Sequence, residues 1–309
     1  PYLKYVYDLG RGLNSLCWWV TSLSYRSSYV SKTFLQSCYL QVALALVGEW
    51  EGPGPLVVVV ADDPVIRALE RNLPGNTGVG GRGAGPFQWA RDTASMVVHR
   101  AFFMAREGSR LIQSRRMIRH PDRPAEPATL LIASVHAGNL NRGGDFHKTS
   151  FGDLAARLGE LGHNVAVAPM VLRDVSHGEA LRRVRSGSAP LLVPHRYLRL
   201  RDLLWAVAST WRRIPLASPL PPLAGMDISP LVKEDLRLHW MSNRAADAFL
   251  MAALTQRWAN QRASIARIIY KYENQPWERA LCWGAKRYLP DTQMVGYQHA
   301  RAPQLYLNY

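Results

Sequence analysis

The sequence predicts an α/β protein: a Rossmann-like, mostly parallel sheet with helices on both faces, preceded by a helical segment. Short runs of apolar and β-branched residues recur along the chain, and helical patterns separate them. Such uninterrupted runs are typical of strands buried on both faces. Strands that alternate with helices favour a parallel sheet covered on both sides. An apolar content of 48% is enough to bury a large core and excludes a disordered chain.

Residues 1–50 are predicted to be helical. Within them, residues 33–48 form an uncharged apolar helix that is shorter than the about 20 residues of a membrane span, and we interpret it as a core helix. Glycines and prolines at 52–55 mark a boundary. Predicted strands then cover residues 56–60, 129–135, 165–171, 191–193, 268–272 and 293–297. Predicted helices cover residues 64–72, 91–120, 151–161, 178–185, 200–213, 229–240, 244–261 and 276–289.

These elements predict an N-terminal helical segment over residues 1–50 and a Rossmann-like α/β domain over residues 51–298. The chain begins with Pro1 rather than Met, which agrees with a fragment or a processed form. The three cysteines are far apart and odd in number, so they predict neither a disulfide framework nor a zinc site. Free cysteines favour a reducing compartment, and we expect the protein to be cytoplasmic.

The formal net charge of +15 is concentrated in two stretches. Residues 100–123 contain seven arginines and two acids, and residues 173–213 contain nine arginines and three acids. A localised basic surface indicates an acidic partner. The basic amphipathic helix 91–120 can lie on an anionic membrane surface, or it can pack on a core and leave its arginines in solvent. No nucleic-acid-binding motif accompanies the arginines, so we expect no nucleic-acid partner.

Parallel sheets bind ligands outside the carboxyl ends of their strands, so the residues that follow strands are the first candidates. Glu273 follows one predicted strand, and Gln298 and His299 follow the next. If the two strands are neighbours in a right-handed βαβ unit, Glu273 and His299 share one edge. A carboxylate and an imidazole there can bind sugar hydroxyls, orient a phosphate or move protons. Alternatively, Glu273 and Asn274 cap the next helix and His299 packs at a turn.

The loop after strand 129–135 contains His136, Asp145 and His147. A base that deprotonates an acceptor hydroxyl could lie here, with Asp145 as the candidate, or the loop could simply be solvated. The spacing of these residues matches no metal motif, and we predict no metal site. The sequence G-x-G-x-x-G at 78–83 follows a helix rather than a strand, so it is not interpreted as a dinucleotide site.

Residues 273–278, Glu-Asn-Gln-Pro-Trp-Glu, followed by Gly-Tyr-Gln-His at 296–299, resemble a family of bacterial surface-carbohydrate biosynthesis proteins. These proteins are glycosyltransferase-like and have two facing Rossmann-type domains, the GT-B arrangement. Weaker similarity covers residues 18–23, 151–154, 162–165 and 227–231, so the resemblance spans most of the chain. Its specific part is the 273–299 stretch, where the family has a small residue or Gly after the His and this chain has Ala300.

The resemblance implies a peripheral membrane glycosyltransferase of surface polysaccharide (O-antigen or capsule-type) biosynthesis. It would transfer a sugar from a nucleotide sugar to a lipid-linked glycan at the inner face of the cytoplasmic membrane, with no further cofactor. Residues 51–298 would be the acceptor-side half, and residues 299–309 would begin a second domain that we expect to be missing. A non-catalytic carbohydrate- or nucleotide-binding assembly protein on the same fold is the alternative.

The candidate residues divide into two sets. The candidate catalytic residues are Asp145, Glu273 and His299. The candidate substrate-binding residues are Asn274, Gln275, Trp277, Gln298 and His147.

Overall fold

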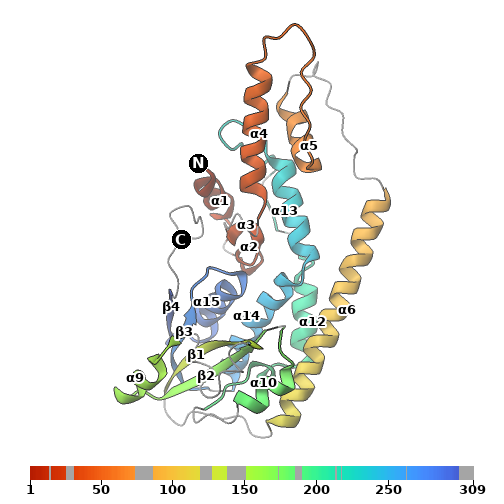
Figure 1. Ribbon diagram of the computed structural model, residues 1–309. Coiled ribbons are helices and arrows are strands. Elements are labelled where there is room, and N and C mark those ends of the chain that lie inside the picture. The colour runs from red at the N-terminus through yellow and green to blue at the C-terminus, as the bar shows by residue number, and fades with distance from the viewer. Residues whose placement is uncertain are drawn as a thin grey trace. The chain divides into compact units, whose positions relative to one another are not determined.

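The computed structural model of the chain is shown in Figure 1. It describes residues 1–13, 15–25, 31–73, 86–118, 127–137, 151–172, 174–184, 190–212, 214–216, 218–261 and 263–298. The described residues form two compact units, and each unit draws on stretches that are far apart in the sequence. Pro1–Arg100 and Thr210–Ala245 contribute to a helical unit, whereas Ala101–Ser209 and Ala246–Ala302 contribute to an α/β unit. The division therefore does not follow the boundary expected at residue 50.

The sheet of the α/β unit has four parallel strands in the order β2-β1-β3-β4. The strands are β1 (Ala128–Val135), β2 (Val165–Val171), β3 (Ile265–Lys271) and β4 (Gln293–Tyr297). Strand β1 pairs with β2 on one side and with β3 on the other, so that Ile132 lies opposite both Ala168 and Tyr270. The direction of winding thus reverses between β1 and β3. In such sheets a ligand crevice forms outside the carboxyl ends of these two strands.

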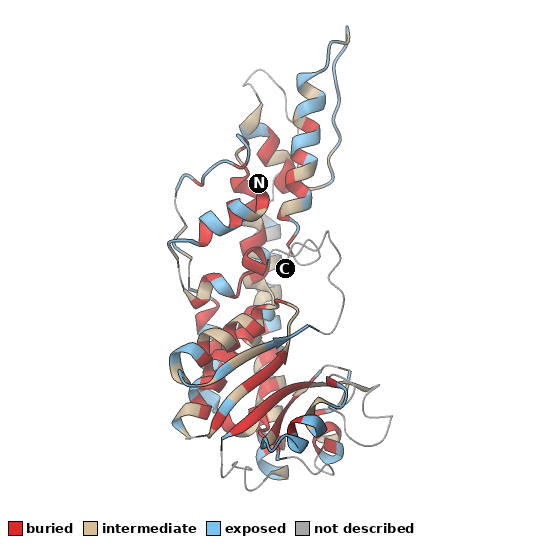
Figure 2. Cartoon of the chain, turned by 90° about the vertical axis from the view of Figure 1, so that its left-hand side faces the viewer, coloured by how far each residue is buried: buried red, intermediate tan, exposed pale blue. Residues whose placement is uncertain are grey.

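Both faces of the sheet are covered, as the apolar runs predict. On one face, α9 (Leu154–Glu160) and α10 (His177–Val184) pack on a core that includes Leu131 and Val167. On the other face, Sγ of Cys282 in α15 (Pro276–Tyr288) donates to the Tyr270 hydroxyl over 3.3 Å. Strand β4 lies at the edge of the sheet and is the most exposed strand, which is visible as its paler colours in Figure 2.

Three further helices complete the α/β unit. They are α11 (Pro194–Tyr197), α12 (Leu200–Ser209) and α14 (Arg244–Asn260), whose first two residues belong to the helical unit. Gly284 lets α15 approach α14 closely, because a Cβ at this position would lie 2.0 Å from Oγ1 of Thr255. Arg257 of α14 donates from Nε to the buried carboxylate of Asp202 in α12 over 2.7 Å. This buried ion pair fixes α12 against α14.

The helical unit has its own core. Its helices are α1 (Tyr2–Gly10), α2 (Leu16–Trp19), α3 (Ser22–Tyr25), α4 (Thr33–Gly48), α5 (Asp63–Asn72) and α13 (Ser229–Met241). Leu23, Leu40, Val65 and Ile228 are completely buried among them. The long helix α6 (Pro86–Met117) contributes its residues up to Arg100 to this unit and the rest to the α/β unit.

A polar cluster is buried inside the helical unit, between α3 and α13. Oγ of Ser22 donates to Oδ2 of Asp235 over 3.2 Å, and the Ser22 N–H donates to Nδ1 of His239 over 3.2 Å. Burial raises the pKa of Asp235 to about 6, although hydrogen bonds from Ser31 and Ser22 oppose the shift. Burial also lowers the pKa of His239 to about 3. Near pH 7 the cluster therefore holds a neutral imidazole beside a buried, ionised carboxylate.

The structure corrects two of the predicted strands. Residues 56–60 form no strand, and Val57 and Val59 are 77% and 90% exposed. Residues 191–193 contribute only an isolated bridge between Leu191 and Val167. The other predicted strands and helices are present, with β2, β4 and α4 at the predicted ends and the rest shifted by a few residues. An apolar run favours burial, but strand pairing also requires a partner that local sequence does not specify.

Helix α4 is buried on one side only, whereas the sequence predicted a core helix. Thr33, Gln36, Ser37, Leu40 and Ala43 are buried, whereas Leu35, Tyr39, Val42 and Leu46 on its other side are exposed. In the described part of the chain, no helix has the length and apolarity that crossing a bilayer requires.

Candidate functional site

A pocket of about 260 Å³ lies at the carboxyl edge of the sheet in the α/β unit. Ser134 near the end of β1, Val171 at the end of β2 and Gln275 beyond β3 all contribute to its wall. The pocket therefore occupies the crevice expected where the winding of the sheet reverses. The other residues that line it are Arg106, Glu107, Arg110, Met170, Leu172, Pro194, His195, Leu198, Asp247, Leu250, Met251, Leu254 and Trp277.

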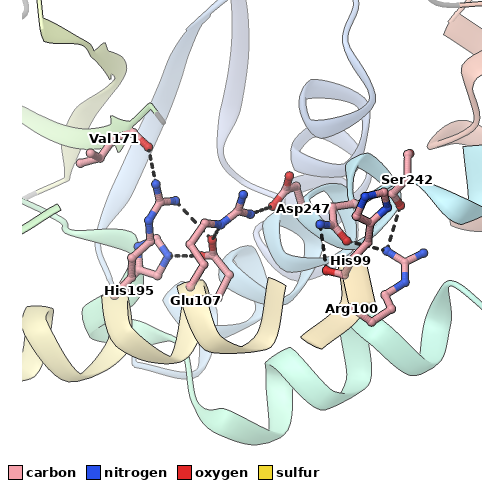
Figure 3. A network of polar contacts seen from close by, with 10 residues as sticks. His99, Arg100, Glu107, Val171, His195, Ser242 and Asp247 are labelled. Carbon is pink, nitrogen blue, oxygen red and sulfur yellow. Dashed lines mark hydrogen bonds and ion pairs between the residues drawn. The ribbon is translucent and has the colours of Figure 1, made fainter. Parts of the chain in front are cut away.

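The polar wall of the pocket is organised around the buried carboxylate of Glu107 in α6 (Figure 3). Nε2 of His195 lies 2.6 Å from Oε2 of Glu107, and Nε of Arg106 lies 2.6 Å from Oε1. Nη2 of Arg106 also donates to Oδ1 of Asp247 over 2.8 Å. Nη1 of Arg110 lies 3.3 Å from Oε1 of Glu107. One carboxylate thus positions two guanidinium groups and an imidazole.

These partners decide the charge of Glu107. Burial alone raises the pKa of this carboxyl group, but the hydrogen bond from His195 and the charges of His195, Arg110 and Arg106 outweigh burial and lower it to about 2. Burial lowers the pKa of Arg106, whereas the charges of Asp247 and Glu107 raise it, and the net shift is upward. The pocket wall therefore carries fixed charges of both signs near pH 7.

His177 in α10 packs against His195. The ring centroids are 5.0 Å apart with an edge-on angle of 73°, and Nε2 of His177 lies 2.9 Å from Oγ of Ser114. Burial, together with the charges of His195 and Arg110, lowers the pKa of His177 to about 3. His177 is therefore neutral near pH 7. The ring of His195 is held between this neutral ring and the ionised carboxylate of Glu107.

The turn between β3 and α15 contains three of the predicted site residues, and a fourth, Trp277, lies in the first turn of α15. Asn274 has a φ of +58°, a left-handed conformation that asparagine adopts more readily than most residues, and its Oδ1 accepts from Nε of Arg279 over 2.9 Å. Nε2 of Gln275 donates to Oε2 of Glu273 over 2.5 Å. Oε1 of Gln275 accepts from Nε1 of Trp277 over 3.1 Å. Gln275 and Trp277 line the pocket, and Glu273 fixes the Gln275 amide.

Glu278, in the first turn of α15, holds this turn in place. Its two carboxylate oxygens lie 3.3 Å and 3.1 Å from the donating N–H of Glu273, and Gln275 and Asn274 also donate backbone hydrogen bonds to it. Burial raises the pKa of Glu278 to about 8, because these hydrogen bonds oppose burial only in part and the charge of Glu273 adds to it. Glu278 thus supplies the acidic half of a capping box, while the side chain of the N-cap residue Gln275 makes no capping bond.

The remaining predicted residues are placed as follows. Strands β3 and β4 are parallel neighbours, so Glu273 and Gln298 both follow strand ends at one edge of the sheet, as predicted. Gln298 is exposed. His299, Asp145 and His147 lie outside the described residues.

Glu107 and His195 were not predicted from the sequence. They are 88 positions apart and approach only in the fold. The one local signal is an acidic residue between Arg106 and Arg110 in an arginine-rich helix. These arginines form ion pairs within the protein, so only part of the charge on α6 faces solvent.

Arg100, which belongs to the helical unit, also directs its guanidinium group to other residues of the protein rather than to solvent. It donates from Nη1 to the backbone oxygen of Ser242 over 2.8 Å and also to the backbone oxygen of Trp240 (Figure 3). Arg115 and Arg116, near the end of α6, are exposed.

In the ranges that the structure describes, no group of three or more His, Cys, Asp or Glu side chains could hold a metal ion. No family model, no curated protein and no solved structure matches the chain. The fold and the pocket define an α/β protein with a parallel, Rossmann-like sheet. Its pocket, at the carboxyl edge of that sheet, combines apolar and charged side chains and is close to the lower end of the about 300–1,000 Å³ range of small-molecule sites.

Proposed function

We propose that the chain is the acceptor-side half of a glycosyltransferase-like protein of bacterial surface polysaccharide biosynthesis, and that the sheet-edge pocket binds the reacting sugars. One observation carries the proposal. Gln275 and Trp277 come from the segment that resembles this family, and they line the same pocket as the Glu107–His195 pair and two arginines. An amide and an indole suit sugar hydroxyls and sugar faces, and guanidinium groups suit a diphosphate.

In the proposed reaction, His195 is the general base. Nε2 of His195 faces Glu107, which fixes the tautomer and stabilises the imidazolium that forms. Nδ1 then takes the proton of an acceptor hydroxyl. The acceptor oxygen forms a bond to the anomeric carbon, the bond from that carbon to the diphosphate oxygen breaks, and the electron pair leaves with the nucleotide diphosphate. Arg106 and Arg110 provide positive charge at the same pocket wall.

The test uses the full-length protein with uridine and guanosine diphosphate sugars and a lipid-linked acceptor. His195→Gln is expected to lower the transfer rate by about 10²–10⁴-fold, the usual contribution of a general base, while donor binding is retained. The matched control is His163→Gln, because His163 is an exposed histidine of the same unit. Transfer at the wild-type rate by His195→Gln would rule out the assigned base.

A non-catalytic carbohydrate- or nucleotide-binding protein is the second candidate. It is favoured by the three positively charged or polar partners of Glu107, since such a network can be purely structural. The same assay separates the two candidates. Binding that is weakened by Gln275→Ala, together with no turnover by the complete protein, would identify a binding protein.

We further propose that α12 brings the protein to an anionic membrane surface. Leu200 and Leu204 are 59% and 56% exposed, and Arg199 and Arg201 beside them are also exposed. Apolar and basic side chains on one surface helix are the usual combination for a headgroup interface. Leu204→Asp is expected to lower co-sedimentation with phosphatidylglycerol vesicles several-fold. Leu161→Asp, at an exposed leucine of the same unit, should leave it unchanged. Equal loss in both variants would contradict the role of α12.

A further inference from the structure

A second pocket, of about 300 Å³, lies between α5 and α13 in the helical unit. Its charged lining consists of four cations and two carboxylates. The cations are Arg67, Arg71, Lys233 and Arg237, and the carboxylates are Glu70 and Glu234. Among the lining side chains, cations therefore outnumber carboxylates, and the site shares no residue with the sheet-edge pocket.

Two of the four cations are neutralised by close partners. Arg237 makes a bidentate pair with Glu234, with distances of 2.6 Å from Nη2 to Oε1 and 2.9 Å from Nε to Oε2, and it also contacts Asp92. Arg71 pairs with Asp227 at 3.2 Å. The carboxylate of Glu234 is therefore largely committed to Arg237.

The other two cations have little compensation. Nη2 of Arg67 lies 3.9 Å from Oε2 of Glu234, which is longer than a hydrogen bond. Lys233 is exposed and forms no hydrogen bond or ion pair with the described residues. Glu70 is exposed on α5 beside Arg71. Asp92 and Asp227 bring the carboxylates around the pocket to four, equal to the cations, but neither Arg67 nor Lys233 forms a hydrogen bond with the described residues.

The spacing of the four cations along α5 and α13 places like charges close together, and their repulsion lowers the stability of the helical unit. Arg67 and Arg71 are four residues apart on α5, and Lys233 and Arg237 are four residues apart on α13. Like charges at this spacing destabilise a helix by a few tenths of a kcal/mol per pair. Here two such pairs line one pocket. A bound anion would remove the repulsion, and guanidinium groups match phosphate oxygens in bidentate geometry.

We propose that the α5–α13 pocket is a binding site for a phosphate or diphosphate group, with Arg67 and Lys233 as the residues that bind it. The group can belong to a soluble ligand or to the headgroup of a lipid. The site shares no residue with the sheet-edge pocket, so it does not depend on the function proposed above.

The test is titration calorimetry of the full chain with inorganic pyrophosphate at low ionic strength. Lys233→Ala and Arg67→Ala are each expected to weaken binding about tenfold or more, the usual effect of losing a charge-assisted hydrogen bond. Lys286→Ala and Arg182→Ala, at exposed cations on helices of the α/β unit, are the matched controls and should bind as the wild type does. Equal affinity of all four variants, or no binding by the wild type, would overturn the proposal.

The unfolding temperature of each variant, measured without ligand, distinguishes a loss of binding from a loss of folding. Lys233→Ala should unfold at the same temperature as the wild type or at a higher one, because it removes repulsion. A clear fall in the unfolding temperature would instead show that Lys233 pairs with a neighbouring carboxylate, and would contradict the proposal.

A competition experiment with phosphatidic acid vesicles distinguishes a lipid headgroup from a soluble phosphate. It uses the Leu204→Asp variant, so that membrane binding through α12 does not contribute to the result. Displacement of pyrophosphate by these vesicles supports a lipid headgroup, and binding that vesicles do not affect supports a soluble phosphate.

Discussion

Glu107→Ala is expected to lower the free energy of unfolding by about 3–5 kcal/mol, the usual loss when one partner of a buried ion pair is removed. The substitution leaves Arg106, Arg110 and His195 at the pocket wall without the carboxylate that holds them. Urea unfolding of the full chain at pH 7, followed by circular dichroism, measures the effect. The control is Glu179→Ala, since the ion pair of Glu179 with Arg183 lies on the surface and should contribute about 1 kcal/mol or less.

Glu107 also makes the free energy of unfolding depend on pH in the acid range. The pKa of Glu107 is about 2 in the folded chain and 4.5 when unperturbed, so its stabilising contribution is present above pH 4.5 and is lost as the pH falls towards 2. Two to three pKa units correspond to about 3 kcal/mol. Glu107→Gln should lack this part of the acid transition. If wild type and Glu107→Gln lose stability in parallel below pH 4.5, the ion-pair network is not as described.

Asp235→Asn is expected to stabilise the protein above pH 6. The pKa of Asp235 is raised from 3.8 to about 6 in the folded chain. The folded state therefore binds the proton more tightly than the unfolded state does, and its advantage is complete below pH 3.8 and lost as the pH rises through 6. At pH 8 the wild type holds a buried charge that costs about 3 kcal/mol. Asparagine resembles the neutral acid and avoids that cost.

The measurement is the free energy of unfolding of both proteins at pH 4, 6 and 8. The difference between them should grow with pH in favour of Asp235→Asn. Asp8→Asn is the control, because Asp8 is exposed and its ion pair with Lys4 lies on the surface of the same unit. A difference that does not change between pH 4 and pH 8 would contradict a raised pKa at Asp235.

The strands of the sheet could be predicted because each is indicated by a short apolar run in the sequence. Strand β2 is an uninterrupted apolar run, and it is largely buried, with both ends as predicted, although it lies at one edge of the four-stranded sheet. Residues 56–60 carry the same local signal, yet they form no strand and are mostly exposed. Nothing within such a run says whether a neighbouring strand will be present. The error therefore concerns strand pairing, which depends on long-range contacts.

The candidate site was predictable only in its contiguous part. Gln275 and Trp277 stand at the start of a helix that follows a strand, and the topology rule places such residues at the ligand edge. The partners of these residues come from α6 and α11, which the sequence does not connect. For helix α6 the sequence left two alternatives, a membrane-surface helix and a core-packed helix with its arginines in solvent. A pattern of arginines does not reveal that Glu107 and Asp247 neutralise two of them.

The order of the chain within the two units has a consequence for synthesis. The α/β unit is built from Ala101–Ser209 and Ala246–Ala302, and half of its strands, β3 and β4, come from the later stretch. The helical unit needs α13, which follows the whole first stretch of the α/β unit. Neither core can close on the ribosome until most of the chain has emerged. Until then the apolar face of β1 is uncovered, so we expect chaperones to bind the growing chain.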